Sequence, residues 1–147
     1  MHLENLIPTL QMAVGPVILI SGVGLLLLSM TNRLGRAIDR ARQLQEAHRS
    51  GTEEDRARLS GQLKILWQRA KLIRASIVWA ATGALLAALL IIFLFISALL
   101  QMQMAAVIAI LFGSCMVAII GSLVYFIRDI NLSLRALQLE MNFDSMK

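Results

Sequence analysis

Arginines around one aspartate are the residues of this sequence whose types and spacing could do chemistry. Arg33, Arg36 and Arg40 flank Asp39 in the stretch NRLGRAIDRAR. A guanidinium group offers several N–H donors in a planar fork, which suits phosphate and carboxylate groups. The stretch therefore predicts either binding of phosphate headgroups or ion pairs within the protein. Which of the two applies depends on how the helices position these side chains.

No catalytic, cofactor or metal site is expected, and we do not expect an enzyme. A hydrolase acting inside a membrane needs a nucleophile and a base within hydrogen-bond reach, but the apolar runs of this sequence contain no His, Lys, Asp or Glu. His2 and His48 fall on opposite sides of the predicted membrane, so they cannot share a metal site. The sequence also contains no glycine-rich loop of the kind that binds nucleotide phosphates. Ion-coupled transport is disfavoured because intramembrane carboxylates usually mark such pathways.

Three uncharged runs, at residues 10–30, 76–100 and 104–127, predict three transmembrane helices in a sequence that is 58% hydrophobic. Each run is long enough to cross about 30 Å of hydrocarbon. A soluble bundle would need three fully apolar helices of this length in a small protein, so we exclude it. The predicted fold class is an all-α membrane protein.

The positions of the charged residues predict the orientation of the chain. All 14 Lys and Arg lie in residues 31–75 or 128–147, and Glu4 is the only acid outside these segments. The positive-inside rule then places residues 1–9 and the 101–103 turn outside and the basic segments in the cytoplasm. Retention beside anionic lipids explains the pI of about 10.4, and no motif indicates nucleic-acid binding.

Long cytoplasmic helical extensions are expected because apolar residues continue past each run at alternating steps of three and four, typical of a coiled-coil seam. In the first arm they are Leu34, Ala37, Ala41, Leu44 and His48, and in the second they are Leu59, Leu63, Leu66, Ala70, Ile73 and Ile77. Gly51 and Thr52 suit helix caps between the arms. Residues 31–75 should therefore form an antiparallel hairpin, and residues 128–147 an amphipathic C-terminal helix.

Two interpretations of the charged cluster remain open. In the first, cations at the membrane interface reach the phosphates of anionic lipids; these are Arg33, Arg36, Lys71, Arg74 and Arg128. Asp39 would then pair with Arg36 on its own helix. In the second, Asp39 reaches Arg69 or Lys71 across the hairpin and fixes its register.

Two stripes of residues indicate contacts between copies of the chain. In the C-terminal helix, one apolar stripe (Ile127, Ile130 and Leu134) can pack on the hairpin, whereas Leu132, Leu139 and Phe143 lie on another face and need a second copy or the lipid interface. In the first helix, residues seven apart could either pack closely on neighbouring helices or line an anion-favouring pore. They are Gly15, Gly22, Ser29 and Arg36. Close packing of the second and third helices is expected through Ala80, Ala84 and Ala88 on one and Ala105, Ala109 and Gly113 on the other.

Residues 15–42 resemble the signature of a family of small bacterial three-span membrane proteins of unknown function. The shared pattern is a Pro-Val opening, an apolar run and then Arg-Leu-x-Arg-x-x-Asp-Arg, found here at Pro16, Val17, Arg33, Leu34, Arg36, Asp39 and Arg40. The resemblance implies a three-span fold in a bacterial inner membrane and brings no reaction, cofactor or substrate. From the helical extensions and the unpartnered apolar stripe, we expect a non-enzymatic homo-oligomeric assembly or interaction platform at the cytoplasmic membrane face. The alternative is an oligomeric passive channel lined by the first helix.

Overall fold

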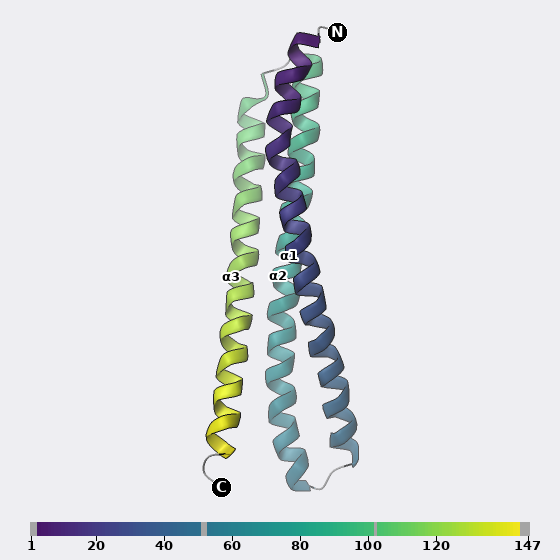
Figure 1. Cartoon of the computed structure of the whole chain (residues 1–147), viewed down its shortest axis with the longest axis vertical. Helices are drawn as coiled ribbons and strands as arrows, with labels where there is room; N and C mark the ends of the chain where they lie inside the picture. The colour runs from purple at the N-terminus through teal and green to yellow at the C-terminus, as the bar shows by residue number, and fades with distance from the viewer. Residues whose placement is uncertain (1–2, 51–52, 102, 145–147) are drawn as a thin grey trace. The chain divides into compact units, whose positions relative to one another are not determined.

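In a computed structural model, the described residues form three long α-helices (Figure 1). The structure describes the backbone of residues 3–50, 53–101 and 103–144, and the side chains of residues 7–49, 59–101 and 103–134. The helices are α1 (Leu3–Ser50), α2 (Glu53–Leu100) and α3 (Ala105–Asp144). No strand occurs among the described residues, and the predicted all-α fold class is confirmed.

Each helix joins one predicted apolar run to its charged extension without a break. All three helices are long and apolar enough to cross a membrane, as the sequence predicts for a multi-pass protein. Pro8 and Pro16 lie inside α1, which continues through both. After α2, Gln101 adopts a φ of 49°, the left-handed conformation that commonly terminates a helix. The predicted caps at Gly51 and Thr52 lie outside the described residues.

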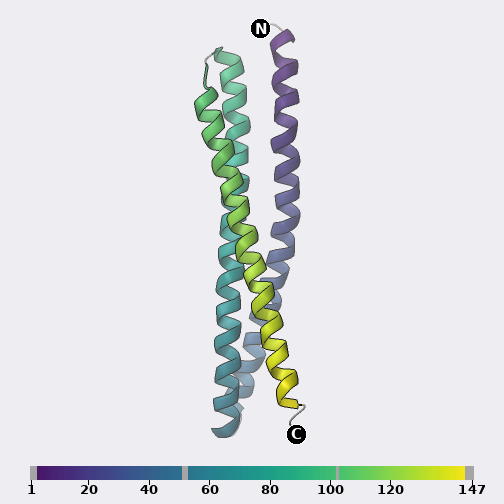
Figure 2. The same cartoon turned by 90° about the vertical axis from the view of Figure 1, so that its left-hand side faces the viewer.

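The chain divides into two compact units, each containing segments of all three helices. The course of each helix can be followed in Figure 2. The first unit comprises residues 1–28 and 78–122, and the second comprises residues 29–77 and 123–147. The first unit holds most of each predicted span, and the second holds most of the helical extensions that the sequence predicts to be cytoplasmic. The charged cluster belongs entirely to the second unit.

In the first unit, α2 and α3 approach closely at two glycines. A Cβ atom added at Gly83 would lie 3.0 Å from Cγ1 of Ile119, and one added at Gly121 would lie 3.1 Å from the Trp79 ring. The thiol of Cys115 donates a hydrogen bond to the Gly83 carbonyl oxygen at 3.2 Å. Small residues thus permit the close approach of α2 and α3 that the sequence predicts, although the small residues on α3 are not the predicted ones.

The face of α3 that makes this contact is not the predicted one. The structure buries Cys115, Ala118 and Ser122, whereas Ala105, Ala109 and Gly113 are exposed. The buried residues recur at steps of three and four, and the same step pattern leads along α3 to Asp129.

In the second unit, the predicted hairpin seam lies on the inner side of α1 and α2. Leu44 and Ile73 are buried and the other seam residues are half-buried, while the adjacent Ile38 and Trp67 are exposed. The hydroxyl of Ser76 donates a hydrogen bond to the Met30 sulfur at 3.2 Å, and both side chains are fully buried. This pattern fits the coiled-coil-like hairpin that the spacing predicts.

The extension of α3 packs differently from the prediction. Of the stripe predicted to face the hairpin, Ile127 and Leu134 are exposed and Ile130 is half-buried, and Leu132, assigned to the outer stripe, is also half-buried. At about 100° per residue, Leu132 lies roughly 60° around the helix from Asp129, while Ile127 and Leu134 lie roughly 140–160° away. Burial of Asp129 therefore turns Ile127 and Leu134 outward. The side chains of Leu139 and Phe143 lie outside the described residues.

Candidate functional site: a buried aspartate between two arginines

Asp129 is the centre of a charged site to which each helix contributes one residue. Its side chain, on α3, has 0% relative exposure. Nη1 of Arg33, on α1, lies 3.5 Å from Oδ2 of Asp129, and Nε of Arg69, on α2, lies 3.5 Å from Oδ1. The site therefore connects all three helices of the second unit through one carboxylate.

Burial explains why Asp129 needs two cationic neighbours. Removing an ionised carboxylate from water costs several kcal/mol unless opposite charges and hydrogen bonds compensate for it. The Arg33 and Arg69 side chains are 29% and 27% exposed. They therefore stay partly hydrated at the surface while they compensate the charge of the buried carboxylate. Taken together, the three groups carry a formal charge of +1.

The two ion pairs differ in their hydrogen bonding. Nη1 of Arg33 donates a hydrogen bond to Oδ2 of Asp129. Nε of Arg69 and Oδ1 of Asp129 are both buried, yet neither has a hydrogen-bond partner among the described residues. Charge-assisted hydrogen bonds are usually about 2.7–2.9 Å long, so both arginines are held loosely, and Arg69 is held by charge alone.

Other residues of α3 help to hold Arg33 and Asp129 in place. The Arg33 guanidinium lies over the Phe126 ring, 5.1 Å from its centroid, a distance at which a cation is attracted to the ring face. The hydroxyl of Ser133 donates a hydrogen bond of 2.8 Å to the backbone carbonyl oxygen of Asp129. Phe126, Asp129 and Ser133 are spaced by about one turn, which puts them on one side of α3.

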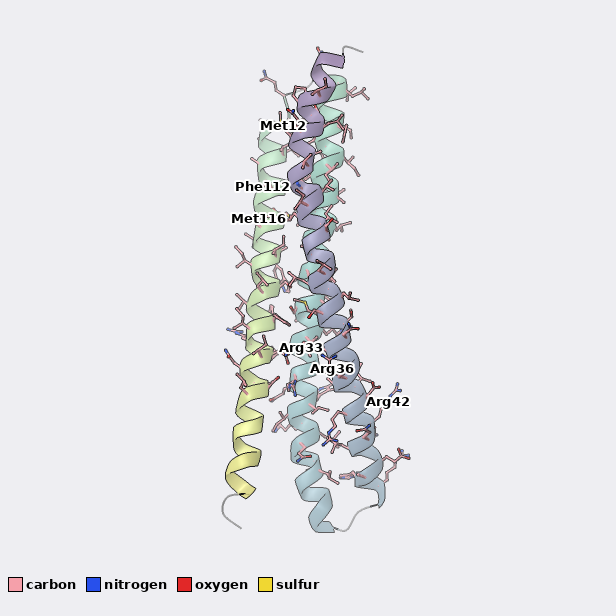
Figure 3. All side chains as sticks on the ribbon, viewed as in Figure 1. Met12, Arg33, Arg36, Arg42, Phe112 and Met116 are labelled. Atoms are coloured by element: carbon pink, nitrogen blue, oxygen red, sulfur yellow. The ribbon has the colours of Figure 1, made fainter. Side chains whose placement is uncertain are left out.

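The structure separates the predicted charged residues into two groups. Arg33 and Arg69 join Asp129, while Asp39 is exposed and makes no ion pair with Arg69 among the described residues. The reason is that Asp39 lies on the outer side of α1, whereas Asp129 lies between the helices. The remaining predicted lipid-facing cations are exposed; they are Arg36, Lys71, Arg74 and Arg128. Arg33 and Arg36 follow one another along α1 (Figure 3).

The seven-residue stripe of α1 lies on the outside of the chain. Gly15, Gly22, Ser29 and Arg36 are all exposed. A Cβ atom added at either glycine would meet nothing within 4 Å among the described residues. These glycines therefore do not serve close packing within one copy of the chain.

Sequence reasoning missed Asp129, although a signal was present. Asp129 comes two residues after the third apolar run and seven residues after Ser122, so it continues the small-residue face of α3. An acid at that position is a candidate for burial next to cations from neighbouring helices. No group of three or more His, Cys, Asp or Glu that could hold a metal ion occurs among the described residues.

A family model described as "Protein of unknown function (DUF2721)" matches residues 13–139, which is most of the chain. This match agrees with the resemblance seen in residues 15–42. No curated protein matches the chain, and no solved structure matches it.

Proposed function

This chain belongs to the DUF2721 family of unknown function, and we propose that it assembles with copies of itself into a non-enzymatic platform at the cytoplasmic face of a bacterial inner membrane. The distribution of basic residues supports this orientation, with the N-terminus outside. The observation that carries the proposal is the exposure of Trp67.

Trp67 is a large aromatic residue exposed outside the predicted spans. It lies on α2, about 13 Å before the apolar run that begins at residue 76, at 1.5 Å per residue, and it is 65% exposed. Headgroups extend only roughly 5–8 Å beyond the hydrocarbon core, so the surroundings at this depth are water, which does not favour an exposed indole over a protein partner. Exposed tryptophans at such positions frequently anchor protein interfaces.

The surroundings of Trp67 leave it available for a partner. The Lys71 ammonium, one turn further along α2, lies 5.6 Å from the ring centroid. Apolar residues of the other two helices are also exposed in the same unit: Ile38 on α1 is 41% exposed and Leu134 on α3 is 55% exposed. Exposed apolar side chains on every helix suit a protein contact better than a small-molecule site, because no single pocket is needed to bury them.

A second copy of the chain is the partner that we propose. In a two-fold contact the same surface is buried on both subunits, so residues of one chain suffice for the whole interface. In the first unit, the exposed Gly15 and Gly22 would let another transmembrane helix approach α1 closely. The exposed features of both units thus support self-association.

Oligomeric mass tests the proposal. Purified full-length protein in detergent should be larger than a monomer by light scattering, and Trp67→Glu should weaken association by about 30-fold or more, as loss of an interface anchor does. Gln68→Glu is the matched control, because Gln68 is also exposed and gains the same charge. A monomeric wild type, or equal masses for the two variants, would contradict the proposal.

The alternative function is a passive channel lined by α1. The observation that favours it is that Gly15, Gly22, Ser29 and Arg36 are exposed along one helix; in a ring of subunits they could face an axial path ending in arginines. The bulky Ile18 lies between the glycines, and apolar side chains of this size dewet a narrow tube. We therefore place the platform first.

A further inference from the structure

We infer that Arg33 and Arg69 together bind one phosphate group of an anionic lipid headgroup, and that Asp129 is the positioning residue, because one nitrogen of each guanidinium group lies 3.5 Å from its carboxylate. This inference rests on the proposed membrane location. The sequence predicts several interface cations that each reach lipid phosphates separately, which we call a diffuse basic belt. Here one phosphate is instead assigned to a single site formed by two arginines.

Unused donors are the first argument. A guanidinium group carries five N–H donors, and Asp129 faces one nitrogen of Arg33 and one of Arg69. No other polar partner of either guanidinium is found among the described residues. The remaining donors of two guanidinium groups that flank one carboxylate match the several oxygens of a phosphate.

The charge balance is the second argument. One carboxylate cannot neutralise two guanidinium groups, so the site keeps a formal charge of +1 next to a fully buried Asp129. A phosphate diester, with one negative charge, would neutralise the site.

Depth is the third argument, and it favours a lipid over an anion in bulk water. Arg33 and Asp129 lie only two or three residues beyond their apolar runs, which is about 3–5 Å at 1.5 Å per residue. Headgroups occupy roughly the 5–8 Å outside the hydrocarbon core. Arg69 lies about 10 Å before the start of the apolar run of α2, which is farther from the bilayer than Arg33 and Asp129. Its Nε nevertheless reaches Asp129. Its side chain therefore extends toward the bilayer and brings its charge to headgroup level.

Charge-conserving substitutions separate this site from a diffuse belt. Arg69→Lys keeps the charge beside Asp129 but removes the planar fork, and Arg74→Lys is the matched control because Arg74 is exposed on the same helix and makes no ion pair among the described residues. We would measure phosphatidylglycerol bound to the full-length protein in detergent by native mass spectrometry. Phosphatidylcholine serves as the lipid without net charge, and inorganic phosphate as a competitor.

The expected result is a preference of the wild type for phosphatidylglycerol over phosphatidylcholine. Arg69→Lys should weaken phosphatidylglycerol binding by about tenfold, because lysine cannot replace the bidentate fork, whereas Arg74→Lys should leave it unchanged. Equal effects of the two variants, or no lipid preference in the wild type, would overturn the inference. Displacement of the lipid by millimolar inorganic phosphate would overturn the assignment to a lipid and identify a free phosphate-type anion as the ligand. Oligomeric mass, measured on the same samples, should not change with Arg69→Lys, which keeps this test distinct from that of the platform.

Discussion

Replacing Asp129 with asparagine should destabilise the packing of the three helices more than any other single charge removal among the described residues. Asparagine keeps the shape of the side chain but leaves Arg33 and Arg69 without a counter-charge. Removing one partner of a fully buried ion pair costs about 3–5 kcal/mol, and removing one from an exposed pair costs about 0.2–1 kcal/mol.

The structure places Asp129 between these limits. Its own side chain has 0% exposure, but the two arginines are 29% and 27% exposed and can regain some hydration. The distances of 3.5 Å are also longer than those of strong charge-assisted bonds. We therefore expect Asp129→Asn to lower the free energy of unfolding by about 2–3 kcal/mol, roughly a 30- to 150-fold change in the equilibrium constant.

Reversible unfolding in mixed detergent micelles, followed by tryptophan fluorescence and circular dichroism, would measure this change. Asp39→Asn is the matched control, since Asp39 is an exposed acid without an ion pair among the described residues, and it should change stability by less than about 0.5 kcal/mol. A double-mutant cycle of Asp129→Asn with Arg69→Gln should give a coupling free energy of about 1 kcal/mol, within the range for residues in contact. If Asp129→Asn were no more destabilising than Asp39→Asn, the assignment of Asp129 as a buried link between the helices would be refuted.

The remaining predictions concern orientation and ion flux. With Cys115 replaced by alanine, an impermeant thiol reagent should label Gln103→Cys in intact cells and Gln45→Cys only after permeabilisation, because the basic segments should be cytoplasmic; labelling of Gln45→Cys in intact cells would reverse the orientation. Proteoliposomes containing the wild type should pass anions no faster than protein-free liposomes. Anion-selective flux that changes to cation-selective with Arg36→Glu would instead establish the channel, since a ring of charge concentrates the opposite ion.

Helix packing in the hairpin could be predicted from the sequence because it depends on local periodicity. The alternating steps of three and four select one side of each arm, and Leu44 and Ile73 on those sides are buried. Exposure of Trp67, one residue after Leu66 of the seam, follows from the same geometry. Nothing beyond the spacing of neighbouring residues was needed for this result.

The packing of α3 could not be predicted in the same way. Its apolar residues form two stripes of similar character. The spacing predicts that the stripe with Ile127, Ile130 and Leu134 faces the hairpin, but Ile127 and Leu134 are exposed and Ile130 is only half-buried. In the second unit, α3 turns toward Arg33 and Arg69 the face that carries Asp129, and burial of this carboxylate depends on the two cations. A contact 96 residues apart in sequence, such as that of Arg33 with Asp129, leaves no periodic signal in either segment.

By itself, the sequence determined the three helices and their capacity to cross a membrane, because length, apolarity and the absence of charge act within each segment. It also determined which side of the hairpin faces inward. Only the tertiary structure decided the partners of the charged residues: Arg69 faces Asp129 and not Asp39, and Arg36 remains exposed while Arg33 is partly buried. The physical reason is that a buried charge needs compensation from opposite charges that converge in space, and convergence is a property of the packed helices and not of any one of them.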